Sequence, residues 1–103
     1  MAVSPTTERQ SDEVLARASQ LRVDLQRIVA SVADGSLGLR EVFERAATSP
    51  VHGFIYLVKV VEALPGVGKV RARRVLEAHG LGERSRVSEV PPAMQNRLVE
   101  AFA

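Results

Sequence analysis

Apolar residues recur at alternating spacings of four and three along the first third of the chain. Such spacing predicts one long amphipathic helix, which Ser4 or Thr7 can cap and Asp34-Gly35 ends. Packing of this stripe on the protein's own core is the favoured interpretation. A homodimeric coiled coil is the second interpretation. It is less favoured because the pattern is shorter than the about three to four heptads that coiled coils use. The stripe and its flanks are Val14, Leu15, Ala18, Leu21, Leu25, Ile28, Val29 and Val32.

A second, shorter helix is predicted to open at Ser36 and the residues after it. Its apolar face repeats at helical spacing, and the polar and proline residues Thr48-Ser49-Pro50 close it and cap the next helix. The face consists of Leu39, Val42, Phe43 and Ala46.

The run from Val51 to Leu64 is ambiguous, because its β-branched and aromatic residues also suit a buried strand. It is longer than most buried strands, lacks strict alternation, and has no second strand-like segment to pair with. We therefore expect a helix, with one apolar side formed by Phe54, Leu57 or Val58, Val61 and Leu64.

Two more helices are predicted in the last third of the chain. The first carries Val70, Arg73, Arg74, Val75 and Leu76 and ends at His79-Gly80, where Gly80 suits a left-handed position and Leu81 packs back on the helix. A polar turn over 82–88, anchored by Val87, precedes a last helix that starts at Pro91-Pro92. Its apolar residues are Met94, Leu98 and Phe102.

These elements predict an all-α fold of about five helices in a single domain, residues 1–103. We divide it into the long helix of residues 1–35, a short helix and turn over 36–50, and a helical module over 51–103. A chain of 103 residues has room for one shared core and not for two domains.

Composition excludes several classes of protein. The chain has no cysteine and two histidines, so neither a disulfide framework nor a thiolate metal site is expected. No apolar stretch approaches the roughly 20 residues of a membrane span, and residues 1–10 are too polar for a signal peptide. We expect a cytoplasmic protein without a metal or cofactor.

Charge is distributed unevenly, although the net charge is only +2. Residues 1–64 carry seven basic and eight acidic side chains, whereas residues 65–86 carry six basic and only two acidic ones. A local excess of +4 on one short piece of chain indicates an anionic partner.

The glycine turn between the third and fourth predicted helices stands in front of this basic segment. In Pro65-Gly66-Val67-Gly68-Lys69, Val67 is expected to point inward as an apolar plug. The glycines allow a phosphodiester to approach main-chain N–H groups at a helix start, where Lys69 adds a full charge. An ordinary tight interhelical turn is the alternative. A nucleotide-binding loop is disfavoured, because Val70 stands where Ser or Thr is needed and no strand precedes.

Arginines on the following helix and in the next turn can extend the contact. Arg71 and Arg74 are three residues apart on one helix and can reach a neighbouring phosphate. Arg73 cannot face the same ligand and is expected to be solvated or ion-paired. Arg84 and Arg86 follow in the polar turn.

The Pro65–Gly68 turn resembles the helix-hairpin-helix motif of DNA-binding proteins. Over nearly the whole chain, and most clearly over residues 53–102 with the word VVEALPGVGKVRARRVL, the sequence resembles the actinobacterial integration host factor family and its helix-two-turns-helix module. A weaker similarity runs to the bacterial ribosomal protein S13. The module assigned to residues 51–103 is then the DNA-binding part.

The resemblance implies a nucleoid-associated architectural protein that binds double-stranded DNA with little sequence preference and bends or constrains it. It implies contacts from the turn and from Arg86 in the second turn. Family members usually have lysines just after Gly53, where this chain has Phe54 and Tyr56, and Ser85 and Ser88 replace usual arginines.

No residue set indicates catalysis. We find no activated nucleophile and no acidic pair beside a base, so the protein is not expected to be an enzyme. The predicted DNA-binding residues are Pro65, Gly66, Val67, Gly68, Lys69, Arg71, Arg74, Arg84 and Arg86. An S13-like RNA- or ribosome-associated module and a helical protein-interaction domain remain as alternatives. A monomer is expected, with a homodimer through the first helix as the second possibility.

Overall fold

The computed structural model describes the backbone of residues 5–103 and the side chains from residue 13 onward. Over that range the only β-type pairing is an isolated bridge between Tyr56 and Arg86. The predicted all-α fold is thus confirmed, with six α-helices in the described range instead of about five. The elements are α1 Pro5–Ala33, α2 Leu39–Ala46, α3 Pro50–Phe54, α4 Leu57–Ala63, α5 Gly68–Ala78, the 3-10 helix η1 Val87–Glu89, and α6 Pro92–Ala101.

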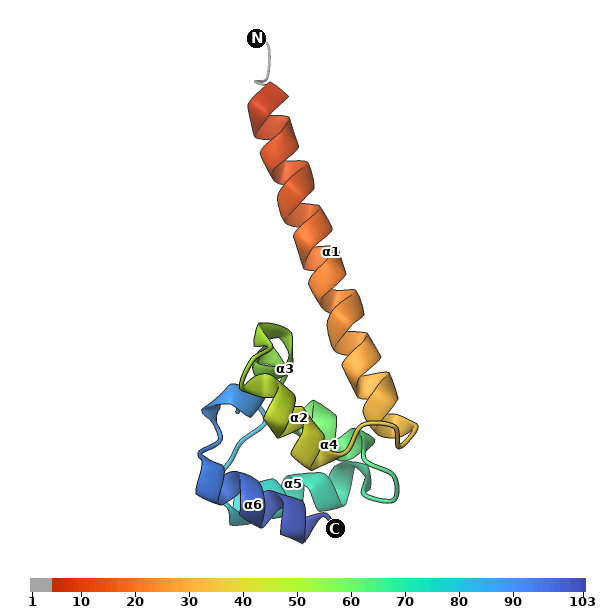
Figure 1. Cartoon of the computed structure of the whole chain (residues 1–103), viewed down its shortest axis with the longest axis vertical. Coiled ribbons are helices and arrows are strands. Elements are labelled where there is room, and N and C mark those ends of the chain that lie inside the picture. The colour runs from red at the N-terminus through yellow and green to blue at the C-terminus, as the bar shows by residue number, and fades with distance from the viewer. Residues whose placement is uncertain (1–4) are drawn as a thin grey trace.

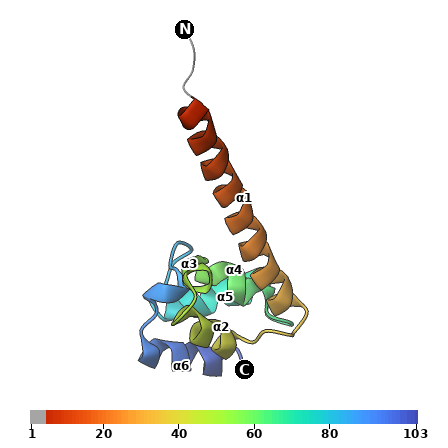
Figure 2. The same cartoon turned by 45° about the horizontal axis from the view of Figure 1, so that its top comes forward.

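Helix α1 projects far beyond the cluster formed by the other helices, so the molecule measures 60 × 26 × 26 Å along its principal axes (Figures 1 and 2). Its C-terminal half packs on α3 and α4 and buries Ile28 and Val32. Val14 and Leu15, in the projecting half, are 64% and 66% exposed. The expectation that the whole stripe packs on the protein's own core is therefore right for the C-terminal half and wrong for the N-terminal half.

The C-terminal end of α1 lies where the sequence predicted it. Asp34 and Gly35 follow the helix, and Gly35 has a φ of +84°. Of the two expected caps, Ser4 lies outside the described residues, and so does the side chain of Thr7.

Helix α2 begins at Leu39, three residues later than predicted. The Ser36 N–H donates to the Asp34 carboxylate at 2.8 Å, and the Leu37 N–H donates to the Ser31 carbonyl at 3.1 Å. These bonds hold the chain in a turn that must be complete before the helix can start. Val42 lies on the predicted apolar face and is fully buried.

The predicted single helix over 51–64 is wrong, because two helices form with an extended link between them. Ile55 and Tyr56 have ψ angles of 143° and 130°, and Phe54, expected on the buried side, is 43% exposed. Ile55 is buried instead. The predicted cap of α3 is confirmed, since the Ser49 side chain accepts a hydrogen bond from the His52 N–H.

Helix α5 and its end follow the predicted pattern with one exception. Gly80 has a φ of +74°, and the Leu81 N–H donates to the Leu76 carbonyl at 2.8 Å, which is the expected C-terminal closure. Val70 is 66% exposed, so the prediction that it belongs to the apolar face is wrong, and Ala72 is buried in its place.

One core joins all of these elements. Its fully enclosed side chains come from α1, α2, α4, α5, η1 and α6, and three of them belong to α4. They are Val32, Val42, Leu57, Val60, Val61, Leu76, Val87 and Leu98. The predicted anchor Val87 and the predicted core residue Leu98 are confirmed.

Candidate nucleic-acid interface

The turn between α4 and α5 has the backbone geometry of a type II turn. Leu64 accepts a hydrogen bond from the Val67 N–H at 3.1 Å, with Pro65 and Gly66 as the two central residues. Pro sets the first central φ, and Gly66, with a φ of +79°, supplies the left-handed second position. Sequence chemistry alone accounts for this turn.

Gly68 adopts a second left-handed conformation at the first residue of α5, with a φ of +74°. A Cβ placed on Gly66 or on Gly68 would meet no other atom within 4 Å. Neighbouring protein atoms therefore do not exclude a side chain there. The backbone conformation requires glycine, and the main chain is open toward solvent on this side.

Val67 anchors the turn. Its side chain is only 9% exposed and belongs to the core, as predicted, while Pro65, Gly66, Gly68 and Lys69 are exposed. The buried Val67 side chain consequently fixes the turn to the core, and the polar main chain of the turn faces solvent.

The start of α5 has no side-chain cap, because Val67 occupies the capping position. Among the described residues, the backbone bonds of turns and caps include none donated by the amides of Gly68 or Lys69. These N–H groups form the partially positive end of the helix dipole, and Lys69 lies beside them. The arrangement suits an anion such as a phosphate.

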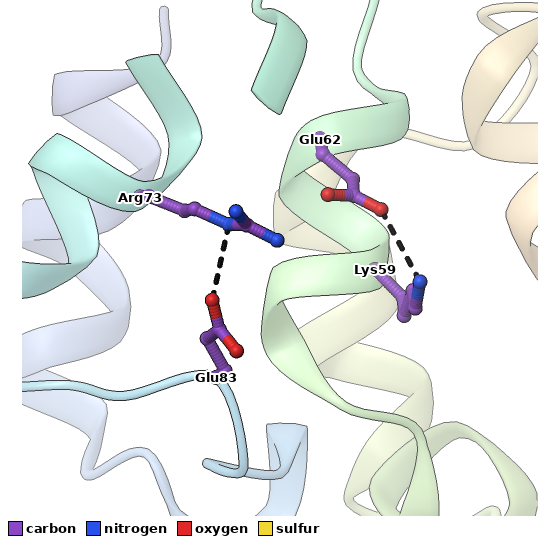
Figure 3. Close-up of polar contacts among 4 residues, drawn as sticks. All are labelled: Lys59, Glu62, Arg73 and Glu83. Atoms are coloured by element: carbon purple, nitrogen blue, oxygen red, sulfur yellow. Dashed lines mark ion pairs between the residues drawn. The ribbon is translucent and has the colours of Figure 1, made fainter. Parts of the chain in front are cut away.

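The basic side chains around the turn are not equally available. Arg73 pairs with Glu83 at 3.3 Å, and Lys59 pairs with Glu62 at 3.5 Å on the neighbouring face of α4 (Figure 3). The prediction that Arg73 is solvated or ion-paired is thereby confirmed, in the form of an exposed ion pair. Arg71 donates from Nη2 to the Ala101 carbonyl at 3.1 Å, so it ties α5 to the end of α6.

Arg74 and Arg84 are exposed, and Arg86 is half-buried. The guanidinium of Arg86 lies over the ring of Phe54, 3.9 Å from its centroid, and 5.2 Å from the centroid of Tyr56. The sequence predicts Phe54 on the apolar side of a helix and otherwise marks the two aromatic residues as departures from a family pattern; it does not predict their contact with Arg86. Their contact with Arg86 depends on the extended link between α3 and α4.

The predicted site residues therefore form two groups at opposite ends of α4. The turn group, residues 65–69 with the start of α5, follows the C-terminal end of α4. Arg86 pairs with Tyr56 just before its N-terminal end. Seven helical residues at 1.5 Å each put about 10 Å of helix between the two groups.

The described part of the chain contains neither a metal-ligand group nor a helix suited to spanning a membrane. Across it there is no group of three or more His, Cys, Asp or Glu side chains placed to hold a metal ion. In the searched residues, no helix combines the length and the apolar character that crossing a membrane requires.

Comparison with known proteins identifies the same elements. The family model of the S13-like H2TH domain matches residues 32–102. The integration host factor of Streptomyces coelicolor is 32% identical over 84% of this chain and 81% of its own length. That of Mycolicibacterium smegmatis is 30% identical over 99% and 97%, respectively.

A solved structure gives the same result in three dimensions. The structure of sIHF bound to an 8-base-pair palindromic DNA superposes with a TM-score of 0.79 at 27% identity, covering 85% of this chain and 99% of that one. The curated relatives carry the name integration host factor, which favours that resemblance over the ribosomal one. From its sequence relatives, its domain model and its fold, the chain belongs to the actinobacterial integration host factor family, built on an S13-like H2TH domain.

Proposed function

We propose that this protein is a non-catalytic architectural protein that binds double-stranded DNA largely independently of sequence and bends or constrains it. The observation that carries the proposal is the open turn at residues 65–69, where two left-handed glycines expose main-chain N–H groups at an uncapped helix start. The DNA-bound structure of a relative with the same fold supports it.

The proposed contact is a phosphate on the amides of Gly68 and Lys69. The helix dipole and the Lys69 ammonium attract the anion, and the missing Cβ atoms let its oxygens reach the main chain. Phosphates are the same at every base pair, so such a contact positions the protein without reading sequence.

Flanking arginines extend this contact to neighbouring phosphates. Arg74 and Arg84 are exposed, and no carboxylate in the described range pairs with them. Arg71 is less available for a phosphate than the sequence alone indicated, because its guanidinium donates a hydrogen bond to the Ala101 carbonyl. We keep it as a proposed contact that a phosphate must share with α6.

The proposal also covers the state and location of the protein. We propose that the whole chain acts as one domain and as a monomer, located with the nucleoid in the cytoplasm. Dimerisation through α1 remains the alternative, since its projecting half exposes apolar residues.

Binding measured against salt tests the proposal. Contact with about four phosphates predicts that log K falls with log[salt] at a slope near −3.6. Parallel titrations use a duplex, the same duplex with scrambled sequence, a single strand of DNA, and an RNA hairpin. We expect similar affinity for both duplexes and weaker binding to the single strand.

Three outcomes would contradict the proposal. Affinity that does not change with salt would exclude phosphate contacts, and a strong preference for one duplex sequence would exclude a backbone-reading mode. Tighter binding to the RNA hairpin would favour the ribosome-related alternative.

Energy transfer between dyes on the two duplex ends, with and without protein, measures bending.

A further inference from the structure

We propose that Phe54 and Tyr56 position Arg86 for a second phosphate contact, separate from the turn at residues 65–69. The inference rests on the proposed function, which it deepens by adding positioning residues that act through Arg86. It starts from a contact that involves no acidic partner.

The backbone places Arg86 directly opposite Tyr56. The Leu57 N–H donates to the Ser85 carbonyl at 2.8 Å, and the Val87 N–H donates to the Ile55 carbonyl at 3.0 Å. These two hydrogen bonds lie on either side of an antiparallel bridge between Tyr56 and Arg86. Tyr56 and Arg86 themselves form the non-hydrogen-bonded kind of pair. In this kind of pair the two side chains lie closest and on the same face.

The ring of Phe54, the last residue of α3, also lies against the Arg86 guanidinium. Phe54 and Tyr56 are 43% and 39% exposed, whereas Ile55 and Leu57 are buried. Successive side chains of an extended segment point to opposite sides, so Ile55 enters the core and the Tyr56 ring lies outside it. The two aromatic side chains are therefore not buried in the core, and their rings can contact Arg86.

The guanidinium lies within cation–π distance of both rings, at 3.9 Å from Phe54 and 5.2 Å from Tyr56. Within residues 13–103 neither ion pair involves Arg86, whereas Arg73 and Lys59 each have a carboxylate partner. A guanidinium held over aromatic rings still has N–H groups along its edge that can donate to two oxygens of a phosphate. Arg86 is thus ordered while its charge is not neutralised by a carboxylate.

Ordering before binding is the physical advantage. A free arginine side chain loses rotamer freedom when it binds a phosphate, and a stacked one has already lost much of it. The ring faces that contact Arg86 cannot at the same time stack on unpaired bases. The cluster therefore favours backbone contact with a duplex over capture of a single strand.

A double-mutant cycle tests this assignment in the full chain. Phe54→Leu keeps an apolar side chain and removes the ring, and we expect about 2- to 10-fold weaker duplex binding with an unchanged salt slope. Arg86→Ala should weaken binding and flatten the slope by about one unit. Phe54→Leu added to Arg86→Ala should then have no further effect, because the ring acts only through Arg86.

Conservative variants and a surface control complete the design. Phe54→Tyr keeps a ring and should restore wild-type affinity, whereas Arg86→Lys keeps the charge but should bind more weakly. Leu15→Ala alters another exposed apolar residue and should change neither affinity nor slope. Thermal melts of every variant separate a loss of binding from a loss of folding.

Tyr56 supplies an independent signal, because the chain has one tyrosine and no tryptophan. Its emission should change when a duplex is added to the wild-type protein and should change less with Arg86→Ala at saturation. Wild-type affinity of Phe54→Leu, or an equal loss in the Arg86→Ala background, would overturn the inference while leaving the turn as the DNA site. Absence of duplex binding by the wild-type protein would overturn the proposed function itself.

Discussion

Gly68 has two separable roles at the scale of single residues. Its positive φ forms the turn, and its missing side chain leaves the start of α5 open. We expect Gly68→Ala to lower the free energy of unfolding by about 1 kcal/mol or more through backbone strain, and to weaken duplex binding. Urea unfolding and salt-titrated binding measure the two effects.

Gly82→Ala is the matched control, since Gly82 has no positive φ and a Cβ there meets nothing within 4 Å. It should leave both stability and binding nearly unchanged. A Gly68→Ala protein as stable as the wild type would contradict the strain argument.

Lys69→Ala separates phosphate binding from turn formation. Lys69 is exposed and makes none of the described ion pairs, so its removal should leave the melting temperature unchanged. The loss of one phosphate contact should weaken binding to all duplexes alike and flatten the salt slope by about one unit. Normal folding together with an unaltered slope would show that this turn is not the DNA site.

His52 introduces a pH dependence that is independent of DNA. Partial burial, and then the nearby positive charge of Arg45, lower the pKa of His52 below its ordinary value of 6.5. The unfolded chain therefore takes up a proton at higher pH than the folded protein. The contribution of His52 to stability is complete above about pH 6.5 and is lost as the pH falls toward the lowered folded-state pKa.

We expect the melting temperature to decrease between pH 7.5 and 5.5, and His52→Gln to reduce that decrease. Asp34 does not interfere, because hydrogen bonds from Ser36 lower its pKa from 3.8 and move its titration to still more acidic pH. An identical pH profile for the variant would exclude His52 as the source.

At the scale of elements, α1 has two halves with different roles. Leu15 in the projecting half is exposed, whereas Ile28 near the other end is 7% exposed and packs in the core. Ile28→Ala should cost about 2–5 kcal/mol of unfolding free energy, and Leu15→Ala no more than about 0.5 kcal/mol. Chemical denaturation of both variants checks the difference.

The Leu15→Ala variant also tests the dimer alternative. If the exposed stripe joined two copies, stability would rise with protein concentration and Leu15→Ala would remove that dependence. Concentration-independent melting of the wild-type protein would support the proposed monomer.

At the scale of the whole molecule, the proposal predicts binding without turnover. Incubation with damaged duplex DNA, intact plasmid or nucleoside triphosphates should yield no product above background. The basis is that the sequence shows no catalytic motif and that the described side chains include no group of three or more His, Cys, Asp or Glu placed to hold a metal ion. A product whose formation disappears with a single point substitution in this chain would contradict the prediction.

Local signals in the sequence determined much of this protein. Helical periodicity located α1, α2, α5 and α6, and the turn residues Pro65 and Gly66 together with Gly80 determined where helices end. Such features depend on neighbours within a few residues along the chain, so a single sequence contains them. The plug Val67 and the anchor Val87 were predictable for the same reason.

Contacts between distant segments decided the remainder. The helix predicted over 51–64 is divided because Ile55 and Leu57 bond to the chain near Arg86, about 30 residues later, and no local pattern contains that pairing. The length of α1 was predictable, but only tertiary packing determined which half of its apolar stripe is covered. The charge of each arginine was visible in the sequence, whereas its partner in space (a carboxylate for Arg73, a carbonyl for Arg71, two rings for Arg86) was decided by the fold.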